Sequence, residues 1–309
     1  MATSQGVVCF KRYIYNDDVG YVELIEKMGD QYTPSEDARM STGKGRLGPE
    51  KDSALQKRLL KDKHTSPFEG VVVKFELCVP LFVLRELDRH RTVTKIMDQE
   101  KGWAVEDALY VDTTTPEEGG RKWFSRNEMS GRYVQLPPQY YFPNDVRYQD
   151  KNNNQAGSTQ SPLDGFHTAL TNTFLERGKK VTEEARGLYD WAVKNNIEKG
   201  LARIFNTQNQ YTRIRLTGSL KNWLDFLSLR LEEGVVLHEC REVALAIQYI
   251  LVDHFPDVMK TWRDEVYNTV AITKNEAEVV RHVLMLMELG ADINPSFFDD
   301  IKKLREKLK

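Results

Sequence analysis

Residues 71–79, with the sequence VVVKFELCV, predict the β-strand that most constrains this fold. One face of such a strand is apolar and consists of Val71, Val73, Phe75, Leu77 and Val79. The other face carries Lys74 and Glu76, because side chains alternate along a strand. Pro80 ends the strand and suits the first turn of a helix, which we predict over 81–91. The chain must therefore pass directly from a strand into a helix whose C-terminal end is rich in charge.

A polar segment, residues 149–161, divides the chain into two parts of different character. Short strands mix with helices before this segment, and the pattern after it is almost wholly helical. Residues 217–230 predict one helix, and a second follows Gly234. The apolar stripe of that second helix consists of Val236, Val243, Ala244, Ile247 and Leu251. We expect a main domain over 1–270, with residues 149–161 as its exposed connector, and a helical extension over 271–309.

The charges of the chain almost cancel, since 44 Lys and Arg stand against 46 Asp and Glu. A net charge of −2 gives no overall field to hold a long polyanion, so we expect no nucleic-acid partner. No run approaches the roughly 18 apolar residues that a membrane span requires. The first residues, MATSQGVVCF, lack the basic and apolar regions of a secretory signal. We therefore expect a cytoplasmic protein with no membrane partner.

The three cysteines, Cys9, Cys78 and Cys240, are odd in number and far apart. This spacing argues against a disulfide framework and excludes a CxxC metal site, so we expect reduced thiols and no metal.

Residues 43–48, GKGRLG, match the GxGxxG pattern of dinucleotide-binding loops. Such a loop must follow an apolar strand and open a helix, because the pyrophosphate lies at the helix N-terminus. The preceding residues are polar, so we interpret the match as a flexible glycine loop.

Three clusters of polar residues are candidates for binding an anionic ligand. Residues 64–69, HTSPFE, place a histidine, a hydroxyl and a carboxylate at a turn, where they could contact a ligand or cap the backbone. Residues 89–91, RHR, offer two guanidinium groups for phosphate, although a solvated charge cluster is the commoner outcome. Residues 127–133, NEMSGRY, combine a Ser-Gly turn with an arginine, which suits a phosphomonoester or forms an ordinary turn.

Arg203 and Arg230 stand in otherwise apolar surroundings. Because arginine is rarely buried without a partner, each should meet a carboxylate or an anionic ligand. An internal salt bridge with Glu232, Glu233 or Glu239 is an equally good explanation.

Taken in order, these segments resemble the flavin-dependent thymidylate synthases. The family's motifs, in chain order, begin with HxSPFEH and APxFVxRQxxRHRxxSxNExSGRY. They continue with a segment that contains AR, a helix that ends in LR, and the motif QxEIRxYA. This chain has HTSPFEG, VPLFVLRELDRHR, NEMSGRY, LARI, LDFLSLR and HECREVALAI. The resemblance implies an α+β fold, with a central, mostly antiparallel sheet flanked by helices, and a homotetramer that holds FAD where subunits meet.

The resemblance also implies roles for individual residues. The residues expected to bind FAD are Ser66, Arg89, His90, Arg91, Glu128, Ser219, Lys221 and Asp225. The residues expected to bind the substrate dUMP are Glu86, Arg89, Ser130, Gly131, Arg132, Arg203 and Arg230. Arg230 would polarise the uracil ring and is the expected catalytic residue.

The activity implied by the resemblance moves a one-carbon unit from methylenetetrahydrofolate to C5 of dUMP and gives dTMP. NADPH supplies the hydride, and no cysteine attacks the base. This agrees with the absence of a Pro-Cys segment and with the position of Cys240 inside a predicted helix.

Several departures from the family pattern predict a divergent, virus-like member. Residues 92–126 separate two motifs that are nearly contiguous in the family, so we expect this insertion to project near the entrance of the active site. The family's glutamine is Glu86 and its PFEH histidine is Gly70. Such changes leave open a hydroxymethylase that acts on dUMP or dCMP, if water quenches the intermediate in place of hydride. A non-catalytic nucleotide-binding homologue and an RNA-binding protein are further alternatives.

Overall fold

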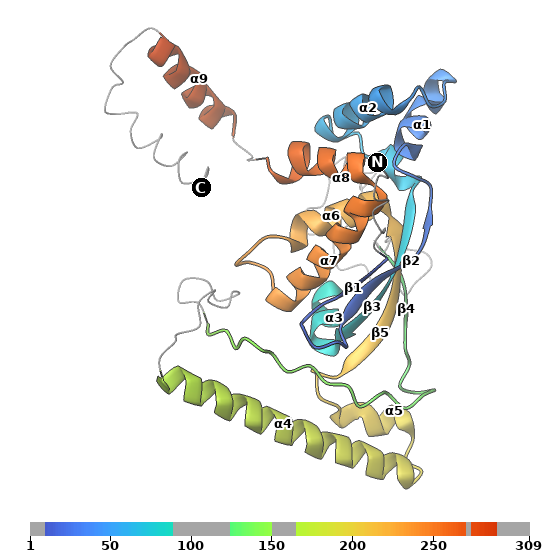
Figure 1. Cartoon of the computed structure of the whole chain (residues 1–309), viewed down its shortest axis with the longest axis vertical. Helices are drawn as coiled ribbons and strands as arrows, with labels where there is room; N and C mark the ends of the chain where they lie inside the picture. The colour runs from blue at the N-terminus through green and yellow to red at the C-terminus, as the bar shows by residue number, and fades with distance from the viewer. Residues whose placement is uncertain (1–9, 89–123, 150–164, 270–272, 289–309) are drawn as a thin grey trace, which may run out of the picture.

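The computed structural model describes residues 10–88, 124–149, 165–269 and 273–288, which include a five-stranded sheet and the helices around it (Figure 1). The strands are β1 (Lys11–Tyr13), β2 (Tyr21–Met28), β3 (Val72–Pro80), β4 (Ser125–Glu128) and β5 (Tyr211–Ser219). Their order in the sheet is β1-β2-β3-β5-β4, and every neighbouring pair is antiparallel. The α+β class predicted from the sequence is confirmed.

Helices connect and cover these strands. The longer helices are α1 (Thr33–Arg39), α2 (Pro49–Lys61), α3 (Leu81–Leu87), α4 (Gly165–Lys194), α6 (Leu220–Arg230), α7 (His238–His254), α8 (Pro256–Trp262) and α9 (Lys274–Glu288). The short ones are η1 (Met40–Thr42), η2 (Ser66–Glu69), α5 (Lys199–Ala202), η3 (Arg203–Phe205) and the π-helical η4 (Arg263–Tyr267). Residues 43–48 lie between η1 and α2, so the GxGxxG match follows no strand, as expected.

Strand β3 confirms the prediction for residues 71–79. Its apolar face is fully buried, whereas Lys74 and Glu76 are only partly covered. Pro80 ends the strand in an extended conformation, with φ −65° and ψ 151°, and α3 begins at the next residue. The helix predicted over 81–91 is described as far as Leu87, and residues 89–91 lie outside the described residues.

The described chain after residue 161 is largely helical, as predicted, and strand β5 is the exception that the sequence did not indicate. It lies between β3 and β4 and pairs with β3 along its whole length, from Tyr211 opposite Pro80 to Ser219 opposite Val72. Residues 217–219, predicted as the start of a helix, are therefore the end of this strand. The Ser219 hydroxyl caps α6 by accepting the Asn222 N–H at 3.2 Å, so the strand runs into the helix without a loop.

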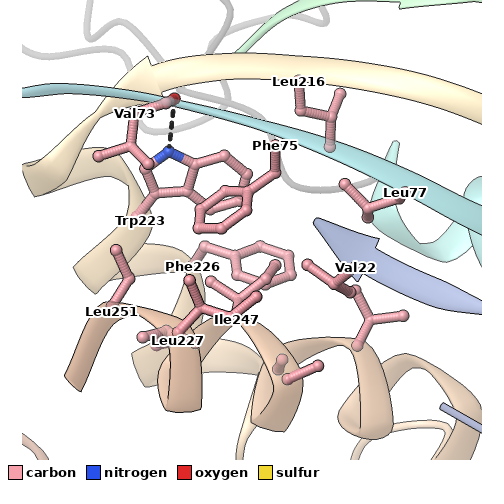
Figure 2. Close-up of a cluster of buried hydrophobic side chains, with 14 of the residues drawn as sticks. Val22, Val73, Phe75, Leu77, Leu216, Trp223, Phe226, Leu227, Ile247 and Leu251 are labelled. Atoms are coloured by element: carbon pink, nitrogen blue, oxygen red, sulfur yellow. Dashed lines mark hydrogen bonds between the residues drawn. The ribbon is translucent and has the colours of Figure 1, made fainter. Parts of the chain in front are cut away.

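The main core lies between the sheet and helices α6 and α7 (Figure 2). Trp223 of α6 is fully buried, and its indole N–H donates to the carbonyl oxygen of Val73 at 3.2 Å. The ring of Phe75 meets this indole edge-on at 4.9 Å between centroids. Leu227 and Ile247 close the same cluster, so α6 is fixed against β3 by packing and by one buried hydrogen bond.

Helix α4, with 30 residues, lies with α5 at the opposite end of the sheet from α1 and α2 (Figure 1). Its surface carries large apolar side chains that no described part of the chain covers, among them Phe166, Phe174 and Trp191, which are 69%, 59% and 57% exposed. Monomeric proteins rarely expose so much apolar surface on one element.

Three predicted segments fall largely outside the described residues. Of the insertion over 92–126, only Phe124 to Arg126 are described, and of the connector over 149–161 only Gln149. Helix α9 lies within the extension over 271–309. Among the described residues, no helix is long and apolar enough to cross a membrane.

Candidate functional site

The segment after β4 forms the first of three groups of predicted site residues, the turn group: Ser130, Gly131, Arg132 and Arg203. The Met129 N–H donates to the Arg213 carbonyl oxygen at 2.9 Å and continues the pairing of β4 with β5. The chain then turns, because the Tyr133 N–H donates to the Ser130 carbonyl oxygen at 3.1 Å. The Ser130 hydroxyl accepts the Arg132 N–H at 3.3 Å and holds the turn.

Helix η3 brings Arg203 to this turn. A Cβ atom added to Gly131 would lie 3.3 Å from Cδ of Arg203, so the glycine allows the arginine to approach the backbone. Both Arg132 and Arg203 are exposed, and neither has an ion-pair partner among the described residues. The salt bridge considered for Arg203 does not form in this part of the chain. Two uncompensated guanidinium groups beside a tight turn suit a phosphate group.

Glu86 and Arg230 form the second group, the helix-end group, where α3 and α6 end. The Arg230 guanidinium is partly buried, and Nη2 donates to the Glu86 carbonyl oxygen at 3.4 Å. Its Nε is buried without a hydrogen-bond partner. A buried donor left unpaired costs roughly 1–3 kcal/mol, so this position calls for an acceptor.

Two of the three carboxylates proposed as partners of Arg230 are engaged elsewhere, and no ion pair joins Arg230 to any of the three, all of which belong to the described chain. Glu233 lies 3.6 Å from Nη2 of Arg241, and Glu239 accepts from Arg147 at 2.5 Å. Cys240 lies close to Arg230, and burial raises the pKa of its thiol to about 12. A neutral, buried thiol is a poor nucleophile, in agreement with the expected chemistry.

The third group, the helix-start group, consists of Ser66, Ser219, Lys221 and Asp225. Helix η2, which begins at Ser66, packs against α6, and the Leu220 N–H donates to the Val71 carbonyl oxygen at 2.7 Å. The N-terminus of α6 therefore lies beside η2, with Lys221 paired to Asp225 at 3.1 Å. Two hydroxyl groups and a lysine gathered at the start of α6 fit the phosphates of a dinucleotide such as FAD.

Glu128 is already engaged by neighbouring side chains. Its Oε1 accepts from the Thr212 hydroxyl at 3.1 Å, and its Oε2 accepts from Nη2 of Arg126 at 2.9 Å. Arg126 also donates to Asp88, the residue that follows α3. Sequence reasoning missed Arg126, because nothing local in the sequence indicates that residues 88 and 126 meet.

Gly70 stands where the resembled family has a histidine. A Cβ atom added there would collide with the carboxylate of Asp37, a residue of α1. A histidine at this position would therefore require the Asp37 side chain to move.

The three groups do not form one site within the described chain. The turn group lies beside α5, whereas the other two lie at the two ends of α6 (Figure 1). Arg89, His90 and Arg91 lie outside the described residues. Among the described residues, no cluster of three or more His, Cys, Asp or Glu could hold a metal ion.

A cavity of about 1100 Å³ lies between α4 and the start of α7. Apolar side chains such as Phe82, Phe174 and Val236 line it, together with the partly buried ion pair of Arg147 and Glu239. No local pattern predicts this pair, which joins residues 92 positions apart. No described residue of the three groups lines the cavity.

Comparisons with known proteins agree with the fold and the motifs. The family model described as thymidylate synthase complementing protein matches residues 23–118 and 120–257. The flavin-dependent thymidylate synthase of Thermus thermophilus is 31% identical over 267 residues, which are 86% of this chain and 84% of the relative. The enzyme of the same name from Treponema denticola is 28% identical over 295 residues, 94% of this chain and 95% of the relative.

A solved structure shares the fold. The UMP/dUMP methylase PolB from Streptomyces cacaoi, bound with 5-Br UMP, superimposes with a TM-score of 0.61 at 19% identity, and the match covers 79% of this chain and 93% of PolB. The family model, the relatives and the solved structure each match most of this chain. The chain therefore belongs to the family of thymidylate synthase complementing proteins.

Proposed function

We propose that this protein is a flavin-dependent thymidylate synthase that transfers a one-carbon unit from methylenetetrahydrofolate to C5 of dUMP. The observation that carries this proposal is the turn group, where Arg132 and Arg203 lie uncompensated beside a tight turn in a chain of this family. The relatives named above are flavin-dependent thymidylate synthases, which supports both the reaction and the cofactor.

The turn group would bind the phosphate of dUMP. Arg132 and Arg203 supply positive charge, and Ser130 and Gly131 supply a hydroxyl and a backbone that a ligand can approach closely. Because the protein is almost neutral, this local charge rather than the overall field would select a small dianionic nucleotide.

Arg230 would act on the uracil ring. A carbonyl oxygen of the base would accept from its unpaired Nε and remove the cost of that buried donor. The fixed positive charge would then stabilise the negative charge that this oxygen carries while the ring is an enolate-like nucleophile, which is the state in which C5 attacks the one-carbon unit. The Glu86 backbone holds the guanidinium in place before substrate arrives.

The helix-start group would hold FAD, with Ser66, Ser219 and Lys221 toward its phosphates. Glu128, Asp225 and the RHR segment, Arg89 to Arg91, complete the cofactor set predicted from the sequence. When bound, FAD supplies the redox chemistry, with NADPH as the reductant. The protein's part is to position both nucleotides and to exclude water from the reacting carbon.

A homotetramer would bring the groups together. The turn group and the helix-end group lie apart on one chain, and α4 presents uncovered apolar side chains of the kind that subunit contacts bury. The folate partner and the cytoplasmic location stay predictions.

The decisive experiment is the mass of the product formed from dUMP, methylenetetrahydrofolate and NADPH by the purified protein. A product heavier by one methylene group supports the proposal, whereas one further oxygen identifies a hydroxymethylase. The same assay with dCMP tests the base. A protein that takes up no FAD contradicts the proposal, and one that binds FAD without turnover is a non-catalytic homologue.

A further inference from the structure

Arg126 joins two elements that are distant in the sequence. It lies on the edge strand β4, and Glu128 lies two residues further on the same face. One guanidinium nitrogen, Nη2, donates to Glu128 at 2.9 Å, and the other, Nη1, donates to Asp88, 38 positions earlier. The planar guanidinium group of Arg126 therefore connects the end of α3 to β4. We call Arg126, Asp88 and Glu128 together the fork.

The connection is partly shielded from water. The side chains of Arg126, Asp88 and Glu128 are 34%, 36% and 30% exposed. Partial burial opposes the charge on Arg126, but its hydrogen bonds to both carboxylates raise its pKa above the usual value. Thr212 of β5 donates to the other oxygen of Glu128 at 3.1 Å, so the fork is also tied to the centre of the sheet.

The fork includes Glu128, which belongs to the proposed FAD-binding set, and it adjoins other positions proposed to bind the nucleotides. Asp88 immediately precedes Arg89, and Glu128 lies two residues before Ser130. We propose that Arg126 is a positioning residue that sets the relative placement of the FAD-binding and dUMP-binding segments without contacting either ligand. This inference rests on the proposed function.

The chain offers a matched control for a test. Arg46 also binds two carboxylates, Asp30 and Glu36, each at 2.8 Å, and its side chain is 42% exposed. It lies in the glycine loop before α2, and neither Arg46 nor its two partners are among the residues proposed to bind a nucleotide. Loss of Arg46 therefore removes an ion-pair fork of the same kind without removing a proposed contact to either nucleotide.

The experiment compares Arg126→Ala with Arg46→Ala by titrating FAD into the apoprotein and following flavin fluorescence. We expect Arg126→Ala to weaken FAD binding by about tenfold, because two charged hydrogen bonds are lost. Arg46→Ala should stay within about twofold of the wild type. Arg126→Lys keeps the charge but cannot fork to both carboxylates, so it should lie between the two.

Melting temperatures separate positioning from folding. Equal melting temperatures for the two alanine variants, with weaker FAD binding only in Arg126→Ala, would support the inference. Equal FAD affinities would overturn it and leave the proposed function intact. If Arg126→Ala does not fold, the FAD titration of the folded Arg126→Lys variant decides. An FAD affinity equal to that of the wild type in this variant overturns the inference. A wild-type protein that binds no FAD overturns both proposals.

Discussion

At the scale of single residues, the surroundings of Arg230 support the role proposed for it. Its Nη2 is held by a backbone carbonyl, and its Nε is buried without an acceptor. The nearby Cys240 is too deeply buried to compete for catalysis. The polar group that could react or bind at this position is therefore the guanidinium itself.

Replacement of Arg230 by alanine should abolish most turnover while leaving FAD bound. We expect a fall in kcat of about 100-fold or more, since a fixed donor to a developing oxyanion contributes on that scale. Steady-state kinetics and the flavin absorbance of the purified variant measure the two effects. Arg58→Ala is the control, because Arg58 is an exposed residue of α2. Loss of the oligomer in Arg230→Ala would show instead that the residue is structural.

At the scale of elements, patterns confined to a few neighbouring residues were predictable, whereas pairings between distant residues were not. Strand β3 was found because its apolar positions alternate and Pro80 marks its end. Strand β5 was missed because it runs into α6 without turn residues, so the helical spacing after Leu220 obscured its alternation. Arg126 was missed for a similar reason, since its role depends on Asp88, 38 positions away.

Trp223 fixes α6 to the sheet, so we expect Trp223→Phe to destabilise the protein by about 2–3 kcal/mol. The change leaves a gap and removes the donor to the Val73 carbonyl oxygen. Urea unfolding followed by circular dichroism measures the loss. Tyr13→Phe, at a residue 61% exposed, should change stability by less than about 0.5 kcal/mol. Equal effects in both variants would contradict this account of the core.

On the scale of the whole molecule, the separation of the turn group from the helix-end group has a testable consequence. If each active site takes Arg132 from one copy and Arg230 from another, two inactive variants should complement each other. Coexpression of Arg132→Ala and Arg230→Ala should form mixed oligomers. These should regain about a quarter of wild-type activity, because random assembly gives about a quarter of the sites an intact Arg132 and an intact Arg230. A mixture as inactive as its components would place both residues in one chain's site.

The buried phenols and thiol of the core predict lower stability at alkaline pH. Burial raises the pKa of Tyr15, Tyr141 and Tyr211 above the ordinary value of 10.0 and that of Cys240 from 9.0 to about 12. The unfolded chain releases these protons first and so binds fewer of them than the folded chain. The free energy of unfolding should therefore fall as pH rises above about 9. Urea midpoints at pH 8 and pH 10 measure the fall, and equal midpoints would contradict it.

The edges of the sheet limit how copies of this protein can associate. Strand β1 has three residues and β4 has four, all exposed, and both carry charged side chains. Short, charged edges resist the addition of a further strand from another chain, which is the route to open-ended aggregates. We therefore expect copies to associate through surfaces other than these two edges, so that assembly ends at a closed particle of fixed size rather than continuing into fibres.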